Sequence, residues 1–354
     1  MRVKNQMVHY ITITFYQFHF KNGGHMKKRK KILLTILVVL IALAATVLIV
    51  LKIAGNHRSD PKDIKTYATT NPFITGKTEQ IAHRFGAGIA PEESLLAIQT
   101  CLTNSNISVD IYEFDLRLTK DEQLVLFHNS TVDATTDATS IFNQTDLLVH
   151  DLTLAELKQL NVGANFTDAD GNKPYATLSD IPDELRILTL AEALDYFATV
   201  GINRFSIEAK DAGEIGMKAV DLLYAELSSR NLLETTIFSS FKTDVSAYAA
   251  ETYPDLIRSN TDAQAIEFFL AAITGNKNYE PPCSVFQLPF NDKYLNMGIN
   301  FATAQIINFA HSHNIAIHYW VVDDPDRISY LASLGVDGIM SDYPDVLTET
   351  MKNQ

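Results

Sequence analysis

From Arg204 onward, short apolar runs alternate with longer segments in which apolar residues recur at helical spacing. The short runs are rich in β-branched and aromatic residues and predict strands, whereas the longer segments predict helices. The predicted strands span residues 204–209, 236–240, 256–259, 284–288, 316–322 and 338–341. This alternation predicts a parallel sheet, because a parallel return requires a crossover of about a dozen residues or more, usually a helix.

Two more strands precede this region, at residues 80–84 and 111–118. Eight strands, each followed by a helix or a long connection, predict an α/β fold of the closed (β/α)8 type, a TIM barrel over residues 78–352. A doubly wound open sheet is the alternative. Residues 129–187 are mostly polar and without regular periodicity, and a connection of this length is usually functional. We therefore expect a small insertion there that acts as a lid.

The second strand carries two carboxylates on one face. Glu113 and Asp115 are two residues apart, so on a strand their side chains point the same way. Facing carboxylates repel unless a positive group separates them, which predicts a hard divalent cation. A turn at 119–122 leads into the apolar run 124–128, which is too close for a parallel return. We therefore expect an antiparallel hairpin strand that ends at His128, beside the carboxylates.

Other polar residues stand near the carboxyl ends of predicted strands, the end at which TIM barrels place their sites. His83 and Arg84 end the first strand, and Glu208 and Lys210 end the third. Trp320 is late on the seventh strand, where it could line a pocket, and Asp342 follows the eighth. Arg84 offers phosphate a planar fork and Lys210 a point charge, while two histidines can exchange acid and base roles near neutral pH. These groups together would suit a metal-assisted reaction with acid and base catalysis, and they are coherent with cleavage of a phosphodiester.

These residues, in this order and spacing, resemble the glycerophosphodiester phosphodiesterase family. The resemblance covers about residues 78–350 and is carried by His83–Arg84, Pro91–Glu92, Glu113 with Asp115, Thr119–Asp121, His128, Glu208 with Lys210, Trp320–Val322 and Gly338–Pro344. It implies a TIM-barrel enzyme that hydrolyses glycerophosphodiesters to glycerol phosphate and an alcohol, with Ca²⁺ or Mg²⁺ as cofactor. It also implies a first attack by a hydroxyl of the substrate's own glycerol.

The same resemblance implies a role for each site residue. Glu113, Asp115 and Glu208 correspond to metal ligands, and His83 and His128 to the acid and base. Arg84 and Lys210 correspond to phosphate contacts. Three departures stand out: Phe85 lengthens the usual His-Arg-Gly, Glu93–Ser94 replaces Asn-Thr, and Asn129 replaces an Asp. A neutral amide at position 129 orients an imidazole without stabilising its cation.

The amino-terminal region has a different character. Residues 32–51 are uncharged and mostly apolar, long enough for about 30 Å of hydrocarbon, so we expect one transmembrane helix at 32–54. The basic segment 1–31 predicts a cytoplasmic amino terminus and an extracellular barrel in the cell membrane. A cleaved signal peptide is the alternative, although its apolar core is usually shorter. Residues 55–77 are expected to be a tether.

Charge limits the partners of the exported part. Residues 1–31 contain eight Lys and Arg and no acid, so the remainder, with 21 basic and 42 acidic residues, has a net charge of −21. This excludes non-specific nucleic-acid binding and favours a partner that is small or neutral, or held by a metal. Together with the resemblance, it implies a glycerophosphodiester or a glycerol-phosphate polymer as the substrate. The oligomeric state stays open. Two alternatives also stay open: a phospholipase C or D acting on intact lipid, and a non-catalytic binding module.

Overall fold

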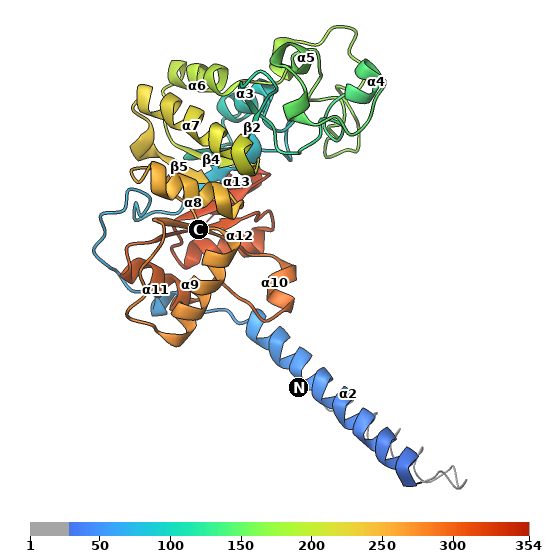
Figure 1. Cartoon of the computed structure of the whole chain (residues 1–354). Coiled ribbons are helices and arrows are strands. Elements are labelled where there is room, and N and C mark those ends of the chain that lie inside the picture. Colours follow the sequence, from blue (N-terminus) through green and yellow to red (C-terminus); the bar gives the residue numbers. More distant parts are fainter. Residues whose placement is uncertain (1–27, 354) are drawn as a thin grey trace.

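The strands form one sheet that is nearly a closed barrel. The computed structural model describes residues 28–353 (Figure 1), so nearly all of the predicted basic segment 1–31 lies outside the described residues. The strands of the described range are β1 (Glu79–Ala82), β2 (Ile111–Leu118), β3 (Leu124–Leu126), β4 (Phe205–Ala209), β5 (Thr236–Ser239), β6 (Ile257–Arg258), β7 (Val285–Pro289), β8 (Ala316–Trp320) and β9 (Gly338–Ser341).

Strand pairing confirms the predicted architecture. Hydrogen bonds join the strands in the order β6-β5-β4-β2-β1-β9-β8-β7, and every neighbouring pair in this order is parallel. β3 instead pairs antiparallel with the end of β2, with Leu116 opposite Leu126. The eight parallel strands and the hairpin therefore agree with the TIM barrel expected from the sequence rather than with a doubly wound open sheet.

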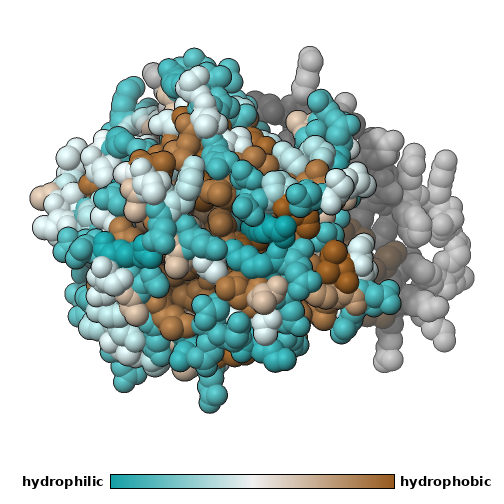
Figure 2. Space-filling view, turned by 90° about the horizontal axis from the view of Figure 1, so that it is seen from above, coloured by the Kyte–Doolittle hydropathy of each residue, from teal (hydrophilic) through white to brown (hydrophobic). Residues whose placement is uncertain are grey.

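Most of the described helices cover the outside of this sheet, whereas α2 extends away from it and α4 and α5 belong to the insertion. The described helices are α2 (Lys28–Gly55), α3 (Leu95–Thr103), α4 (Ala138–Phe142), α5 (Leu154–Leu157), α6 (Leu190–Thr199), α7 (Gly213–Ser229), α8 (Thr243–Thr252), α9 (Asp262–Thr274), α10 (Asp292–Asn296), α11 (Ala304–Ser312), α12 (Pro325–Ser333) and α13 (Pro344–Lys352). Apolar side chains between strands and helices form one large cluster in each half of the barrel. Polar residues cover most of the face seen in Figure 2, with apolar residues exposed in patches between them.

The interior of the barrel is apolar at the amino ends of the strands. Side chains from five strands meet there: Ile81, Ile111, Ile237, Val285 and Ala316. Met340 belongs to the same cluster and also lines the pocket at the other end. Phe73, which precedes β1, joins this cluster and is fully buried. The Asn71 side chain donates to the carbonyls of Ser284 and Asn314, which fixes the segment beside β7 and β8. Residues 55–77 thus differ from the expected tether, because their polar groups and Phe73 pack against the barrel.

The insertion at 129–187 has a small core of its own. Val132, Val149 and Leu157 are buried in a cluster that also contains Val125 of β3. An isolated bridge joins Thr131 to Leu148 and folds the segment back on itself. In Figure 1 this green lobe lies beside α3 and β2, and none of its described residues lines the pocket that is discussed below. Its structure therefore differs from the predicted lid.

Helix α2 extends away from the barrel (Figure 1). Its apolar side chains are exposed along its length; Leu33, Leu43 and Ile53 are 65%, 62% and 60% exposed. At its end, Gly55 is buried and lies against the backbone of Leu295 in α10. Within residues 28–353, no helix has both the length and the apolar character required to cross a membrane. The transmembrane helix predicted at 32–54 is therefore not confirmed.

Candidate active site

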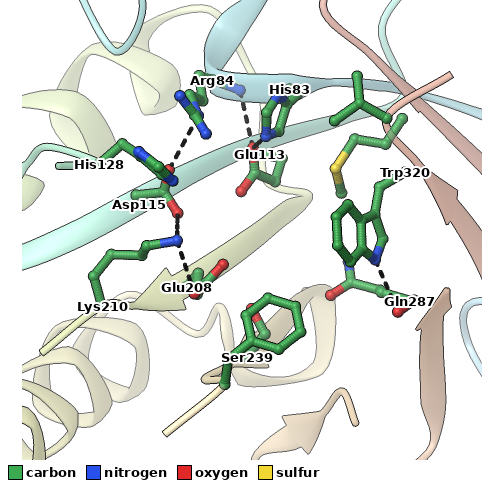
Figure 3. Close-up of a pocket in the computed structure, with 13 residues that line it drawn as sticks. His83, Arg84, Glu113, Asp115, His128, Glu208, Lys210, Ser239, Gln287 and Trp320 are labelled. Atoms are coloured by element: carbon green, nitrogen blue, oxygen red, sulfur yellow. Dashed lines mark hydrogen bonds and ion pairs between the residues drawn. The ribbon is translucent and has the colours of Figure 1, made fainter. Parts of the chain in front are cut away.

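The residues predicted for the site converge on one pocket at the carboxyl ends of the strands. Figure 3 shows this pocket, which has a volume of about 150 Å³. All eight predicted residues line it: His83, Arg84, Glu113, Asp115, His128, Glu208, Lys210 and Trp320. Five further residues line it that were not predicted as site residues: Ser239, Phe241, Gln287, Val321 and Met340. The structure thus brings all eight predicted side chains to one pocket, and the catalytic, metal and phosphate roles assigned to them stay predictions.

The carboxylates lie on neighbouring strands. Glu113 and Asp115 are on β2, and the parallel register places Asp115 beside Glu208 of β4. The side chains of Glu113 and Asp115 are 7% and 2% exposed. Burial raises the pKa of both Glu113 and Glu208 to about 7, since a buried carboxylate loses its hydration. The strand register therefore concentrates three acidic groups in a space where their charge must be compensated.

Two cations supply this compensation in the structure. Lys210 Nζ lies 2.9 Å from Glu208 Oε1 and 3.4 Å from Asp115 Oδ1, while Arg84 Nε lies 3.3 Å from Asp115 Oδ2. Burial alone would raise the pKa of Asp115, but Lys210 and Arg84 outweigh burial and lower it. Arg84 also binds Glu92 through Nη1 at 3.0 Å. The carboxylates and cations of the pocket are thus in direct ion pairs with one another.

The loop that carries His83 and Arg84 has an unusual backbone. Arg84, Phe85 and Gly86 have φ angles of 47°, 66° and 95°, in the left-handed region that L-residues avoid. This turn directs the Arg84 N–H toward Glu113 Oε2, at 2.9 Å. Phe85 is fully buried and packs on Tyr112, Phe114 and Phe197. Aromatic packing therefore offsets the strain of about 1–2 kcal/mol expected for one such residue.

The imidazole of His83 is held by a carboxylate. His83 Nδ1 lies 2.5 Å from Asp342 Oδ1, and the Asp342 N–H donates to Asp323 Oδ1. The other ring nitrogen, Nε2, lies 3.8 Å from Glu113 Oε2. Burial would lower the pKa of His83, but Glu113 and Asp342 outweigh burial and raise it. Asp342 therefore orients His83 and favours its protonated form, a function that its position after β9 alone did not reveal.

His128 has a different environment. Its Nδ1 lies 3.0 Å from Asn129 Oδ1, an amide oxygen that only accepts hydrogen bonds. Nδ1 therefore carries the proton in the neutral ring, which leaves Nε2 as an acceptor. Burial lowers the pKa of His128 to about 4. The hydrogen bond with Asn129 acts in the opposite direction and raises the pKa of His128, but burial outweighs it.

Aromatic side chains form the opposite wall of the pocket. Trp320 Nε1 donates to the Gln287 carbonyl at 2.9 Å, which fixes the indole against β7. The ring of Phe241 meets Trp320 edge to face, with 5.8 Å between the ring centroids. In Figure 3 the charged residues lie on one side and Trp320 on the other. The pocket can therefore hold a ligand that is anionic at one end and in apolar contact at the other.

Comparison with known proteins agrees with this geometry. Residues 83–346, most of the chain, match the glycerophosphoryl diester phosphodiesterase family. The chain belongs to this family. A glycerophosphodiester phosphodiesterase of Bacillus subtilis (strain 168) is 26% identical over 289 residues, which cover 77% of this chain and 86% of that protein. Human glycerophosphodiester phosphodiesterase 1 is 31% identical over 181 residues, covering 51% of this chain and 48% of the human protein.

Solved structures of glycerophosphodiester phosphodiesterases share the fold. A putative enzyme of Silicibacter pomeroyi covers 84% of this chain and 98% of its own, with a TM-score of 0.61 at 20% identity. An Oleispira antarctica phosphodiesterase, solved in complex with the product sn-glycerol-3-phosphate, has a TM-score of 0.56 at 21% identity and covers 79% of this chain and 99% of its own. As a glycerophosphodiester phosphodiesterase, the chain is a phosphoric diester hydrolase.

The family resemblance also implied a divalent metal ion, for which Glu113, Asp115 and Glu208 are the candidate ligands. Within residues 28–353, no three His, Cys, Asp or Glu side chains are arranged around a metal position. Lys210 and Arg84 instead lie against the carboxylates. The donors are nevertheless of the kind that Ca²⁺ and Mg²⁺ prefer, and Asp115 Oδ2 is buried with no hydrogen-bond partner. The residues therefore fit a hard cation in chemical type.

Proposed function

We propose that the chain hydrolyses glycerophosphodiesters to glycerol 3-phosphate and an alcohol with the residues of this pocket. The observation that carries the proposal is the convergence of two histidines, three carboxylates, Arg84 and Lys210 on one cavity, from positions spread over more than a hundred residues. A binding module would have no need for two histidines that can act as acid and base beside Arg84 and Lys210. The geometry therefore favours catalysis over the non-catalytic alternative.

The two histidines divide the proton transfers. In the proposed first step, His128 Nε2 accepts the proton of a glycerol hydroxyl of the substrate, whose oxygen bonds to phosphorus. The bond from phosphorus to the alcohol oxygen breaks, and His83 delivers a proton to that oxygen. Water then opens the cyclic phosphate with the roles reversed. His128, with its free Nε2, suits the base, and His83, oriented by Asp342, suits the acid.

The cations of the pocket bind the phosphate in this proposal. Arg84 and Lys210 both form ion pairs with Asp115 in the structure. When an anionic substrate binds, its phosphate oxygens would replace Asp115 in some of these contacts. A planar guanidinium can donate two hydrogen bonds to the non-bridging oxygens of a phosphate, and an ammonium adds a point charge. Trp320 and Phe241 would then contact the glycerol or alcohol portion. The position of the phosphate thus determines which oxygen faces each histidine.

The cofactor remains a proposal of its own. Glu113, Asp115 and Glu208 would hold a Ca²⁺ or Mg²⁺ ion. When bound, this ion neutralises charge on the phosphate oxygens. The support is the presence of three buried carboxylates for two neighbouring cations, Lys210 and Arg84, and the lack of a hydrogen bond to Asp115 Oδ2.

The test of the proposed activity compares substrates. The full chain, supplied with Ca²⁺ or Mg²⁺, is incubated with glycerophosphocholine, with a poly(glycerol phosphate) polymer and with vesicles of intact phosphatidylcholine. Release of glycerol 3-phosphate from the first two supports the proposal. Release of phosphocholine or phosphatidate from the vesicles alone would support the phospholipase alternative, and no release from any substrate would reject the assignment to hydrolysis in this pocket.

We also propose that α2 attaches the protein to the cell membrane with the barrel outside. The support is the run of apolar residues at 32–51, their exposure along α2 and the lysines and arginine before them. The last turn of α2 lies against α10, in the connection that follows β7, at the barrel end that carries the pocket. Attachment through α2 would therefore hold the pocket near the lipid surface.

Fractionation tests the location. The full chain should stay in the membrane fraction after extraction at alkaline pH, and protease added to intact cells should cut the barrel. A variant in which Leu40 and Leu43 of α2 become Lys should be released. The matched control changes Ile266 and Leu270 to Lys, two exposed apolar residues on α9, and should stay attached. Recovery of the unmodified chain in the soluble fraction would reject the anchor.

A further inference from the structure

We propose that Arg117 and Asp211 position His128 for the reaction, as an ion pair that acts through the backbone of this histidine. The inference rests on the proposed function, because it assigns His128 to proton transfer. Arg117 lies two residues after Asp115 and continues the face of β2 that begins with Glu113. Neither Arg117 nor Asp211 is among the residues that line the pocket. Their effect on the reaction therefore has to pass through another residue.

The contacts of Arg117 lead directly to His128. Arg117 Nε and Nη2 both donate to the His128 carbonyl oxygen, at 3.0 and 2.7 Å. Arg117 Nη1 donates to Asp211 Oδ1 at 2.5 Å, and the other oxygen of Asp211 accepts the Leu118 N–H at 3.0 Å. The Arg117 and Asp211 side chains are only 10% and 9% exposed. Each of the three guanidinium nitrogens of Arg117 thus donates a hydrogen bond, and both side chains of the pair are almost completely shielded from water.

The position of His128 explains why such support is needed. The β3 ladder ends at Leu126, and the Phe127 N–H still bonds to the Asp115 carbonyl at 3.1 Å. His128 follows at the point where the chain leaves the sheet for the insertion. Two charge-assisted hydrogen bonds on one carbonyl restrict both translation and rotation of that peptide. Arg117 therefore replaces the strand pairing that His128 lacks.

Asp211 connects this support to the rest of the pocket. It follows Lys210 directly and lies three residues after Glu208, just beyond β4. The Lys210 N–H bonds to the Leu116 carbonyl, so β4 and β2 remain paired up to this point. The ion pair therefore joins the ends of β2, β3 and β4, which carry the carboxylates, the proposed base and the phosphate-binding lysine. If the end of β2 or β4 moved, the hydrogen bonds of Arg117 and Asp211 would move the His128 backbone with it.

Stability alone gives little reason for an ion pair at this position. Replacing a buried pair with apolar residues is often neutral or stabilising, because both charges lose their hydration on burial. The barrel contains a second such pair at its opposite end, Arg204 with Glu79 at 2.8 Å, with side chains 25% and 3% exposed. Among the described residues, the hydrogen bond between these two side chains leads to no residue that lines the pocket. It offers a matched control for the structural consequences of removing an arginine.

The experiment is a double-mutant cycle on the full chain, with release of glycerol 3-phosphate as the assay. Arg117→Met should lower kcat about 10- to 100-fold and leave KM within about threefold, since small displacements of a reacting group cost about this much. In the His128→Ala background the same change should have almost no further effect, because its route to the reaction is already lost. Arg204→Met should lower the melting temperature but keep kcat within about twofold.

A second variant keeps the test informative if Arg117→Met does not fold. Lysine at position 117 keeps a cation for Asp211 but cannot donate in a fork to the His128 carbonyl, so Arg117→Lys should fold and still lose kcat. The inference is overturned if either variant keeps kcat within twofold, or if the loss is as large in the His128→Ala background. Absence of activity in the unmodified chain would instead reject the proposed function.

Discussion

The two ends of the barrel are built on different principles. At the amino ends of the strands, Phe73 fills the interior among apolar residues such as Ile81 and Val285, and Arg204 lies over its ring at 4.7 Å. At the carboxyl ends, the interior holds carboxylates, cations and histidines around a pocket. Packed apolar side chains thus fill the amino end, whereas charged and polar side chains line an open pocket at the carboxyl end.

Each end also contains a buried ion pair, and the difference between the pairs is informative. Glu79 is the first residue of β1 and Arg204 directly precedes β4, so this pair joins the amino ends of two strands, far from the pocket. The Arg117 and Asp211 side chains are 10% and 9% exposed, against 25% and 3% for Arg204 and Glu79, and two Arg117 hydrogen bonds end on the backbone of a pocket residue. Because burial gives an ion pair little net stability, its function has to be inferred from what it contacts.

The largest difference between the ends is expected for catalysis. His128→Ala should reduce kcat by about 10² to 10⁴, the usual contribution of a general base, while the melting temperature changes little. The side chain lies in the pocket and is not part of an apolar cluster. Steady-state kinetics and thermal unfolding of the same preparation check both parts. Unchanged turnover would remove His128 from the mechanism.

The opposite result is expected at the amino end. Phe73→Ala should reduce the free energy of unfolding by about 3–5 kcal/mol, because it empties a fully buried aromatic position. Turnover below the new melting temperature should stay within about twofold. Denaturant unfolding combined with kinetics measures this. If kcat fell as strongly as in His128→Ala, the two ends would not be separable.

A smaller effect is expected from His318, which is buried in β8 beside Gly338 and makes no hydrogen bond in the described structure. Burial, and then Arg204, lower its pKa to about 3. The unfolded chain, with a pKa of about 6.5, therefore binds the proton first, and stability falls as the pH drops below about 6.5. We expect a loss of about 2–3 kcal/mol between pH 7 and pH 4.5.

Unfolding measured across this pH range, with His318→Leu as the reference, checks the assignment. The variant should lose this part of the pH dependence, because its side chain has no proton to bind. An identical slope in both proteins would mean that another group is responsible.

Most of the fold was predictable because its signals are local and repeated. Each parallel strand of the barrel produces a short apolar run followed by a helix, and the hairpin was fixed by the short distance between β2 and β3. Helix α6 was missed, although Thr189 and Glu192 form the capping box that marks its start. Phe73 was missed as well, since one aromatic residue in a polar segment gives no periodic signal.

The sequence predicted eight of the residues that line the pocket, but it did not predict which of them contact one another. Spacing of two along β2 predicted that Glu113 and Asp115 share a face, and the same rule extends to Arg117, which was not selected. Which acid pairs with which cation depends on side-chain geometry between strands that are distant in sequence. The orientation of His83 by Asp342 spans 259 positions and has no sequence signal beyond the two residues themselves.

The proposal on which the mechanism most depends is that Glu113, Asp115 and Glu208 would hold a divalent cation that the reaction needs. The most direct measurement is release of glycerol 3-phosphate from glycerophosphocholine by the full chain after dialysis against EDTA, and again after addition of Ca²⁺ or Mg²⁺. We expect activity to disappear with chelation, to return with the metal, and to stay absent in Asp115→Asn under both conditions. Full activity of the chelated enzyme would contradict the account.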